Sequence, residues 1–301
     1  AWAQSPSGQA AIAKHRLTGL PGLWNHFYDR VHTILKRHRV AAAGWEELGA
    51  RRQQADGKGP LVPNEHFKGR GFTLFVWNNL DDNEDLAYRL ANAGYRSVLA
   101  PATALYFDMA HHRDPSEPGV NWAAVLDLDT VFNYVPFDAL RTAPGQPGTP
   151  AGKTALSETG RRHVAGLEAT LFSEILHTRD RLDYMLMPRM LGLAERAWAA
   201  DPAWASERDP LKAQALHTQA WSLFAHQLGS QVLPRLTREM PSLHWRIPSP
   251  GLQREGDAVR VNLQLPGLAV RYTSDGSEPT LGSEFVHVPI RTPLTVRAAA
   301  F

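Results

Sequence analysis

Short apolar runs alternate with amphipathic helical segments over the first two-thirds of the sequence, and this alternation constrains the fold more than any other feature. The apolar runs occupy residues 40–45, 72–77, 97–100 and 164–171. Helical periodicity is strongest at residues 23–39, 83–93 and 181–198. Buried strands separated by helices pair in parallel, because the chain must cross over the sheet between them. The sequence therefore predicts an α/β fold built on a parallel sheet.

The pattern changes after residue 241, where residues 259–265, 269–273 and 294–299 alternate apolar and polar side chains at period two. This alternation is typical of strands with one buried face, and Asp275-Gly276 indicates a hairpin turn. Residues 141–157 are rich in proline and glycine and are expected to form a loop. Because 301 residues suffice for two domains, we expect an α/β domain over residues 1–241 and a small all-β module over residues 242–301.

Composition excludes several classes of function. Lys and Arg number 32 and Asp and Glu 30, so the net charge of +2 argues against nucleic acid as a partner. The chain has no cysteine, which excludes a disulfide framework, a zinc–thiolate site and a cysteine nucleophile. No apolar run approaches the ~20 residues of a membrane span, and residues 1–10 do not resemble a signal peptide. Because the 13 histidines lack metal-binding spacing, we expect neither a metal nor a cofactor.

Aromatic and acidic side chains lie at or just beyond the ends of the four apolar runs. They are Trp45, Trp77, Tyr106, Asp108, Phe172 and Glu174. In parallel α/β sheets the functional residues gather where the strands end. Aromatic rings can stack on the C–H face of a sugar while carboxylates accept hydrogen bonds from its hydroxyls. This pattern therefore predicts a carbohydrate site on one concave face.

A packing role competes with this interpretation for most of the nine tryptophans. The tryptophans without carboxylate neighbours are assigned to the core, and they are Trp2, Trp24, Trp198, Trp204 and Trp221. For Trp45, Trp77 and Trp122, each beside polar residues, packing and binding both stay open. The adjacent acids Glu46-Glu47 and Asp81-Asp82 are interpreted as solvated charges of a loop or of a helix start.

Several strings in this chain resemble the family-20 glycoside hydrolases, the β-N-acetylhexosaminidases and chitobiases. GWEE (44–47), FVWNN (75–79), GYRSVLAPATALYFDM (94–109) and GLEATLFSE (166–174) resemble the regions of their barrel strands five to eight, in order. YMLMPRMLGLAERAW (184–198) is similar to their closing helix. WRIPSPG (245–251) and YTSDGSEPT (272–280) resemble their C-terminal immunoglobulin-like module. The resemblance implies the C-terminal half of a (β/α)8 TIM barrel, strands 5–8, followed by a small all-β sandwich.

The family resemblance also implies an activity, the hydrolysis of terminal non-reducing N-acetylhexosamine with retention. In this family the 2-acetamido group of the substrate itself is the nucleophile. By match, Trp45 and Trp77 would wall the acetamido pocket. Tyr106 would donate a hydrogen bond to the acetamido oxygen as that oxygen attacks the anomeric carbon. The partner implied is an oligosaccharide or glycoconjugate that contains N-acetylglucosamine.

Further roles follow from the same match. Asp108 and Glu174 would hold sugar hydroxyls, and Trp122 would stack on the next sugar or line the mouth of the site. Phe172 stands where the family usually has Trp, so the stacking area there is smaller.

The catalytic Asp-Glu pair of the family has no match in this chain. AWAQSP (1–6) resembles text that lies just after that pair. We therefore expect the general acid Glu and the assisting Asp to be missing, and the chain to be inactive alone. We also expect a dimer or a complementary N-terminal half at its open sheet edges, and a periplasmic or secreted parent protein. The alternatives are a non-catalytic glycan-binding unit and a structural fragment that needs a partner chain.

Overall fold

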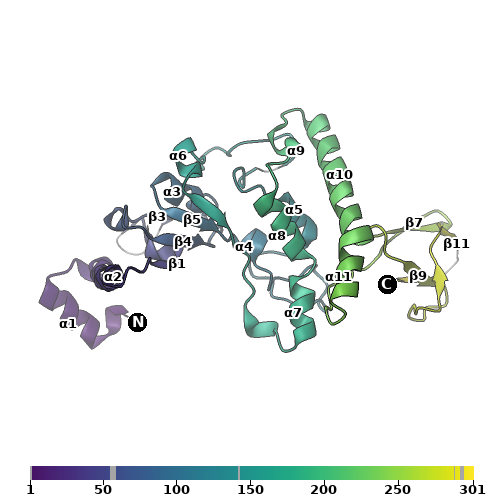
Figure 1. The fold of residues 1–301 in the computed structure, drawn as a ribbon, viewed down its shortest axis with the longest axis horizontal. Helices are drawn as coiled ribbons and strands as arrows, with labels where there is room; N and C mark the ends of the chain where they lie inside the picture. Colours follow the sequence, from purple (N-terminus) through teal and green to yellow (C-terminus); the bar gives the residue numbers. More distant parts are fainter. Residues whose placement is uncertain (1, 55–58, 142, 288, 292–294) are drawn as a thin grey trace.

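The computed structural model describes residues 2–54, 59–141, 143–287, 289–291 and 295–301. Along its longest axis follow two N-terminal helices, a parallel sheet, a group of helices, and a β module at the other end (Figure 1). The N-terminal helices are α1 (Pro6–His15) and α2 (Gly19–Arg37). Among the described residues, no helix is both long and apolar enough to pass through a bilayer.

The central sheet is entirely parallel, as predicted, with the strand order β1-β4-β5-β6. Its strands are β1 (Ala43–Trp45), β4 (Thr73–Val76), β5 (Arg96–Leu99) and β6 (Val164–Leu167). Trp45 lies opposite Phe75, and Phe75 lies opposite Val98, so the carboxyl ends of the strands share one edge. Side chains alternate between faces, and the face that carries Val76 and Leu99 is almost fully buried.

Short helices and one extra ribbon surround the sheet. The helices are α3 (Leu86–Asn92), α4 (Ala102–Leu105), α5 (Leu128–Asn133) and α6 (Glu158–Arg161). The antiparallel ribbon pairs β2 (Ala50–Arg52) with β3 (Leu61–Pro63). The described part of the predicted loop 141–157 contains no helix or strand, and Ser157 caps α6 by accepting a hydrogen bond from the N–H of Gly160.

The prediction of a single helix over residues 181–198 is wrong. The structure has α7 (Arg179–Leu186) and α8 (Arg189–Trp198), with an interruption at Met187-Pro188. Proline cannot donate the helical hydrogen bond, and its ring pushes the preceding residue into the extended conformation that Met187 adopts. The chain continues through α9 (Ala203–Ser206), α10 (Pro210–Gln227), the π-helix η5 (Leu228–Val232) and α11 (Leu233–Glu239).

The packing role predicted for Trp198 is also wrong, because its side chain is 89% exposed. It is the last residue of α8, so its ring lies beyond the part of that helix that packs into the core. The packing role predicted for Trp204 is confirmed, because its side chain is 1% exposed. Trp221 packs against the core cluster to which Trp204 belongs. Trp24 packs against the core cluster beside the sheet. Trp2 is 38% exposed, so its assignment to the core is wrong as well, although its ring centroid lies 5.5 Å from that of Trp24.

The C-terminal module is all-β, as predicted, and consists of two three-stranded antiparallel sheets. One has the order β10-β9-β12 and the other β11-β8-β7. The bounds are β7 (Gly251–Glu255), β8 (Ala258–Asn262), β9 (Val270–Thr273), β10 (Glu284–Phe285), β11 (Ile290–Arg291) and β12 (Arg297–Ala300). The strand expected over residues 294–299 corresponds to β12, and residue 294 lies outside the described residues.

The predicted hairpin turn at Asp275-Gly276 is wrong, since β9 pairs with β10, which begins only at Glu284. Asp275 instead accepts hydrogen bonds from the N–H and hydroxyl of Ser277, which closes a local turn inside a longer loop. The tight hairpin joins β7 to β8 through Gly256 and Asp257. Every residue of β7 is exposed, so this strand lacks the alternation of buried and exposed side chains from which a strand is predicted.

The β module packs directly on the preceding helices. Leu228 and Leu233 share a core cluster with Leu265, and Trp245 packs against the same cluster. At Gly229 a Cβ atom would stand 2.1 Å from the carbonyl oxygen of Pro266, so this close approach requires glycine. Polar contacts cross the same joint, where the Gln264 amide donates a 3.0 Å hydrogen bond to Asp127.

Candidate functional site

Four aromatic rings meet where strands β4, β5 and β6 end. Tyr106 is central, with its ring centroid 6.3 Å from Trp77, 6.0 Å from Trp122 and 5.4 Å from Phe172. Trp77 lies nearly parallel to Tyr106, at 29°, whereas Trp122 and Phe172 meet Tyr106 edge-on. We call these four residues the aromatic cluster. Phe172 is 39% exposed and Trp122 is 55% exposed, so the cluster is open to a ligand.

Backbone pairing beyond the strand ends assembles this cluster. The N–H of Phe107 donates to the carbonyl of Thr170 at 2.7 Å, and the N–H of Thr170 donates to Leu105 at 3.0 Å. This extension of the β5–β6 pairing brings the segment of Phe172 beside Tyr106. A second bridge, between Met109 and Val120, returns the loop that carries Trp122 to the same place.

Asp108 and Glu174 lie beside the cluster. Asp108 is 4% exposed, and its Oδ1 atom has no hydrogen-bond partner among the described residues. Burial raises the pKa of Asp108, and the nearby charge of Glu174 raises it further. Glu174 itself is exposed. A buried carboxylate oxygen without a partner is costly, so a ligand hydroxyl would stabilise it.

The loop that carries Tyr106 and Asp108 is fixed by Arg189, whose side chain is fully buried at the start of α8. Its Nη1 donates to the carbonyls of Met109 at 2.8 Å and Leu126 at 2.9 Å. Its Nη2 donates to the carbonyl of Phe107 at 2.5 Å. Arg189 therefore holds the carbonyls of the two residues that flank Asp108, and it acts as a positioning residue.

Glu46 is a buried residue of the site, so its interpretation as a solvated charge is wrong. Its side chain is fully buried and accepts backbone hydrogen bonds from Trp77 at 3.0 Å and Asn78 at 3.3 Å. Burial raises the pKa of Glu46 to about 7. Its only sequence signal is its position directly after a strand, which its exposed neighbour Glu47 shares. Asp81 and Asp82 are exposed, as predicted.

The remaining predicted residue, Trp45, lies at the end of β1, beside Glu46. It is 39% exposed and meets Phe75 edge-on at 6.3 Å, and it makes no ring contact with the aromatic cluster among the described residues. The structure thus brings together Trp77, Tyr106, Asp108, Trp122, Phe172 and Glu174. Within the described part of the chain, no three His, Asp or Glu side chains are placed to hold a metal ion.

A parallel α/β sheet whose carboxyl edge carries aromatic rings and carboxylates is the arrangement in which α/β enzymes place their ligand sites. The chain belongs to glycosyl hydrolase family 20. The model of that family's catalytic domain matches residues 1–201, and the model of the chitobiase/beta-hexosaminidase C-terminal domain matches residues 232–301. The TIM-barrel catalytic domain of the family and an all-β C-terminal domain both fit the observed fold.

Relatives of this chain include two curated proteins of Vibrio. The N,N'-diacetylchitobiase of Vibrio harveyi is 27% identical over 290 residues, covering 91% of this chain and 31% of that protein. The beta-hexosaminidase of Vibrio vulnificus is 24% identical over 298 residues, which cover 92% of this chain and 34% of that protein. A crystal structure of a Vibrio harveyi family-20 exo beta-N-acetylglucosaminidase in complex with N-acetylglucosamine has a TM-score of 0.54 at 25% identity, covering 81% of this chain and 30% of that one. The chain spans about a third of the length of these relatives.

Proposed function

We propose that this chain is part of a β-N-acetylhexosaminidase that removes terminal non-reducing N-acetylhexosamine from oligosaccharides or glycoconjugates with retention of configuration. The observation that carries the proposal is the aromatic cluster around Tyr106, with the unpartnered carboxylate oxygen of Asp108 beside it. Rings for the C–H face and carboxylates for the hydroxyls are what a sugar site requires.

In the proposed mechanism the acetamido oxygen of the substrate attacks the anomeric carbon while the glycosidic bond breaks. A general acid protonates the leaving oxygen, and water then hydrolyses the cyclic intermediate at the anomeric carbon. Tyr106 donates a hydrogen bond from its hydroxyl to the attacking oxygen. Burial raises the pKa of Tyr106, and the charge of Glu46 raises it further, so the phenol stays a donor at neutral pH. Trp77 walls the acetamido group, and Asp108 and Glu174 hold hydroxyls.

The finer assignment is also a proposal. Strands β1, β4, β5 and β6 correspond to barrel strands five to eight, and the general acid Glu and assisting Asp come from a segment other than these 301 residues. In the described structure β1 and β6 each pair on one side only, which suits completion by a dimer or a complementary N-terminal half. The parent protein is proposed to be periplasmic or secreted.

A non-catalytic glycan-binding role is the alternative. It is favoured by the openness of the aromatic cluster, in which Phe172 is 39% exposed and Trp122 is 55% exposed, because rings and carboxylates alone can hold a sugar. Turnover separates the two functions, because binding without a general acid releases no product.

The test uses a chromogenic N-acetylglucosaminide. The 301-residue chain alone should show no turnover, and a form of the protein that is extended through the Asp-Glu pair should show it. In that form Tyr106→Phe should lower kcat by about 10²–10³-fold, because one preorganised donor to the reacting oxygen is lost. Tyr272→Phe, in the β module, is the matched control and should keep the parent rate. Robust turnover by residues 1–301 alone would show that a catalytic acid lies within this chain.

A further inference from the structure

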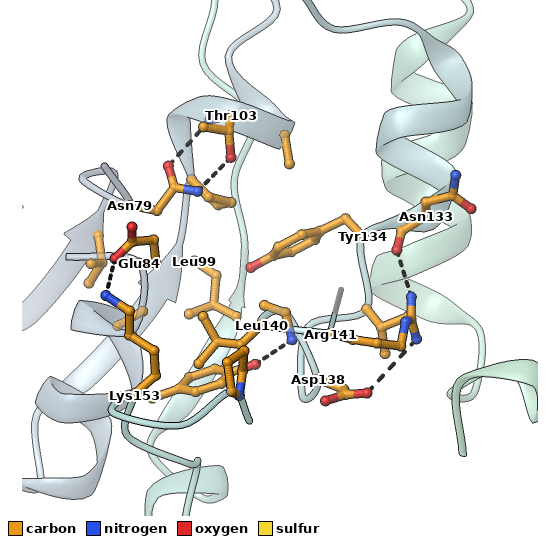
Figure 2. A pocket seen from close by; sticks show the side chains of 18 of the residues that line it. Asn79, Glu84, Leu99, Thr103, Asn133, Tyr134, Asp138, Leu140, Arg141 and Lys153 are labelled. Carbon is orange, nitrogen blue, oxygen red and sulfur yellow. Dashed lines mark hydrogen bonds and ion pairs between the residues drawn. The ribbon is translucent and has the colours of Figure 1, made fainter. Parts of the chain in front are cut away.

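A cavity of about 650 Å³ lies on the opposite face of the sheet from Trp45 and Phe75. Its floor includes Val76 and Leu99, whose side chains alternate with Phe75 and Val98 along β4 and β5. Residues 130–141 form the facing wall, and Lys153 lies at its border (Figure 2). None of the four residues of the aromatic cluster lines this cavity. Its size is within the ~300–1,000 Å³ typical of small-molecule sites.

The charged groups of this cavity are neutralised in pairs. On one side Lys153 Nζ lies 2.6 Å from Glu84, and on the other Arg141 lies 3.9 Å from Asp138. Figure 2 shows the two pairs on opposite sides of Leu99 and Tyr134. The formal charges that line the cavity therefore cancel, although Arg141 Nη1 itself makes no hydrogen bond among the described residues.

The hydroxyl of Tyr134 is a polar group of the cavity that has no protein partner among the described residues. Tyr134 follows α5, and Figure 2 shows its ring reaching across the cavity with the hydroxyl pointing toward Leu99. That hydroxyl makes no hydrogen bond to any described residue. By contrast, the side-chain amide of Asn79 is hydrogen-bonded to Thr103. The hydroxyl of Tyr88 donates to the carbonyl of Pro136 and accepts from the N–H of Ala139. Tyr134 can therefore both donate to a ligand and accept from it.

We propose that this cavity is a second ligand site that binds a neutral, hydroxyl-rich ring of monosaccharide size. The apolar face of the ring lies on Val76 and Leu99. Its hydroxyls bond to Tyr134 and to the carboxylates of Glu84 and Asp138, which accept hydrogen bonds beyond their ion pairs. The site is separate from the aromatic cluster, and the proposal does not depend on the hydrolytic activity proposed above.

The test follows the methyl NMR signals of Val76 and Leu99 in the full chain during titration with glucose or N-acetylglucosamine. Both signals should shift and saturate with at least one of these sugars, and comparing the two shows whether an acetamido group is required. Tyr134→Phe keeps the ring and should weaken this binding by roughly two- to tenfold, the effect of one hydrogen bond. Glu84→Gln keeps the shape and should weaken it as well.

Trp77→Ala is the matched control, because it alters the aromatic cluster and leaves the cavity lining intact. It should not change the response of Val76 and Leu99. The proposal is overturned if neither signal saturates with either sugar, or if Trp77→Ala abolishes the response while Tyr134→Phe preserves it. Saturation by cyclohexane with no response to the sugars would also overturn it, because the cavity would then select apolar ligands.

Discussion

The buried carboxylate of Glu46 accepts a 3.0 Å hydrogen bond from the backbone N–H of Trp77. Glu46 follows β1 and Trp77 follows β4, so this bond joins the ends of two strands on the side of the sheet where the aromatic cluster lies. A buried acid in this place couples the geometry of the candidate site to pH.

Glu46→Gln should change how stability depends on pH. The pKa of Glu46 rises from 4.5 to about 7 in the folded chain, so between these values the folded state holds a proton that the unfolded state has lost. The free energy of unfolding should therefore fall as pH rises from 4.5 to 7, by up to about 3 kcal/mol. Urea unfolding across this range should show the fall in the parent and not in Glu46→Gln. Glu47→Gln, at the exposed neighbour, is the control, and equal pH slopes in all three proteins would contradict the prediction.

Arg189→Met should destabilise the loop that carries Tyr106 and Asp108. The change removes every hydrogen bond that Arg189 donates to the carbonyls of Phe107, Met109 and Leu126. Each buried carbonyl left without a donor costs about 1–3 kcal/mol, so several kcal/mol of unfolding free energy should be lost. Arg235→Met removes only an exposed pair with Glu239 and should change the free energy of unfolding little. Similar losses in the two variants, measured by urea unfolding, would show that Arg189 does not hold the loop.

Arg246→Met should loosen the connection between the α/β domain and the β module. The buried guanidinium of Arg246 lies 3.6 Å from both Glu117 and Asp127, and its removal leaves two carboxylates without this cation. Breaking buried pairs costs about 3–5 kcal/mol, so limited proteolysis should cut the connection near residues 241–250 faster than in the parent. Arg291→Met, whose ion pair with Asp257 is about 80% exposed, should be cleaved at the parental rate. Unchanged cleavage in Arg246→Met would mean that apolar packing alone docks the module.

Phe172→Trp should strengthen sugar binding. Phe172 is 39% exposed and meets Tyr106 edge-on, so the site has room for a larger ring that adds stacking area and an indole donor. We expect N-acetylglucosamine to bind about two- to tenfold more tightly, measured by calorimetry. Phe285→Trp in the β module is the control and should leave the affinity as it is. Weaker binding by Phe172→Trp would show that this position limits the size of the site.

Local patterns were sufficient to predict the parallel sheet, the all-β module and the residues at the strand ends. Strand and helix periodicity depend on neighbours within a few residues, and the strings shared with family 20 lie along the chain in the family's order. The same local information failed at Met187-Pro188, where a strong helical period concealed a break, and at β7, which has no buried face.

Burial and long-range pairing were decided by the tertiary structure alone. Glu46 and Glu47 are chemically identical neighbours, yet only Glu46 turns inward to meet an N–H that lies 31 residues further along the chain. Arg189 finds the carbonyl of Phe107 across 82 residues, and Trp198 is exposed because its helix ends beyond the core. The sequence determined which side chains could form a sugar site. Only the folded chain decided which of them meet, because contact and desolvation depend on residues that are distant in sequence.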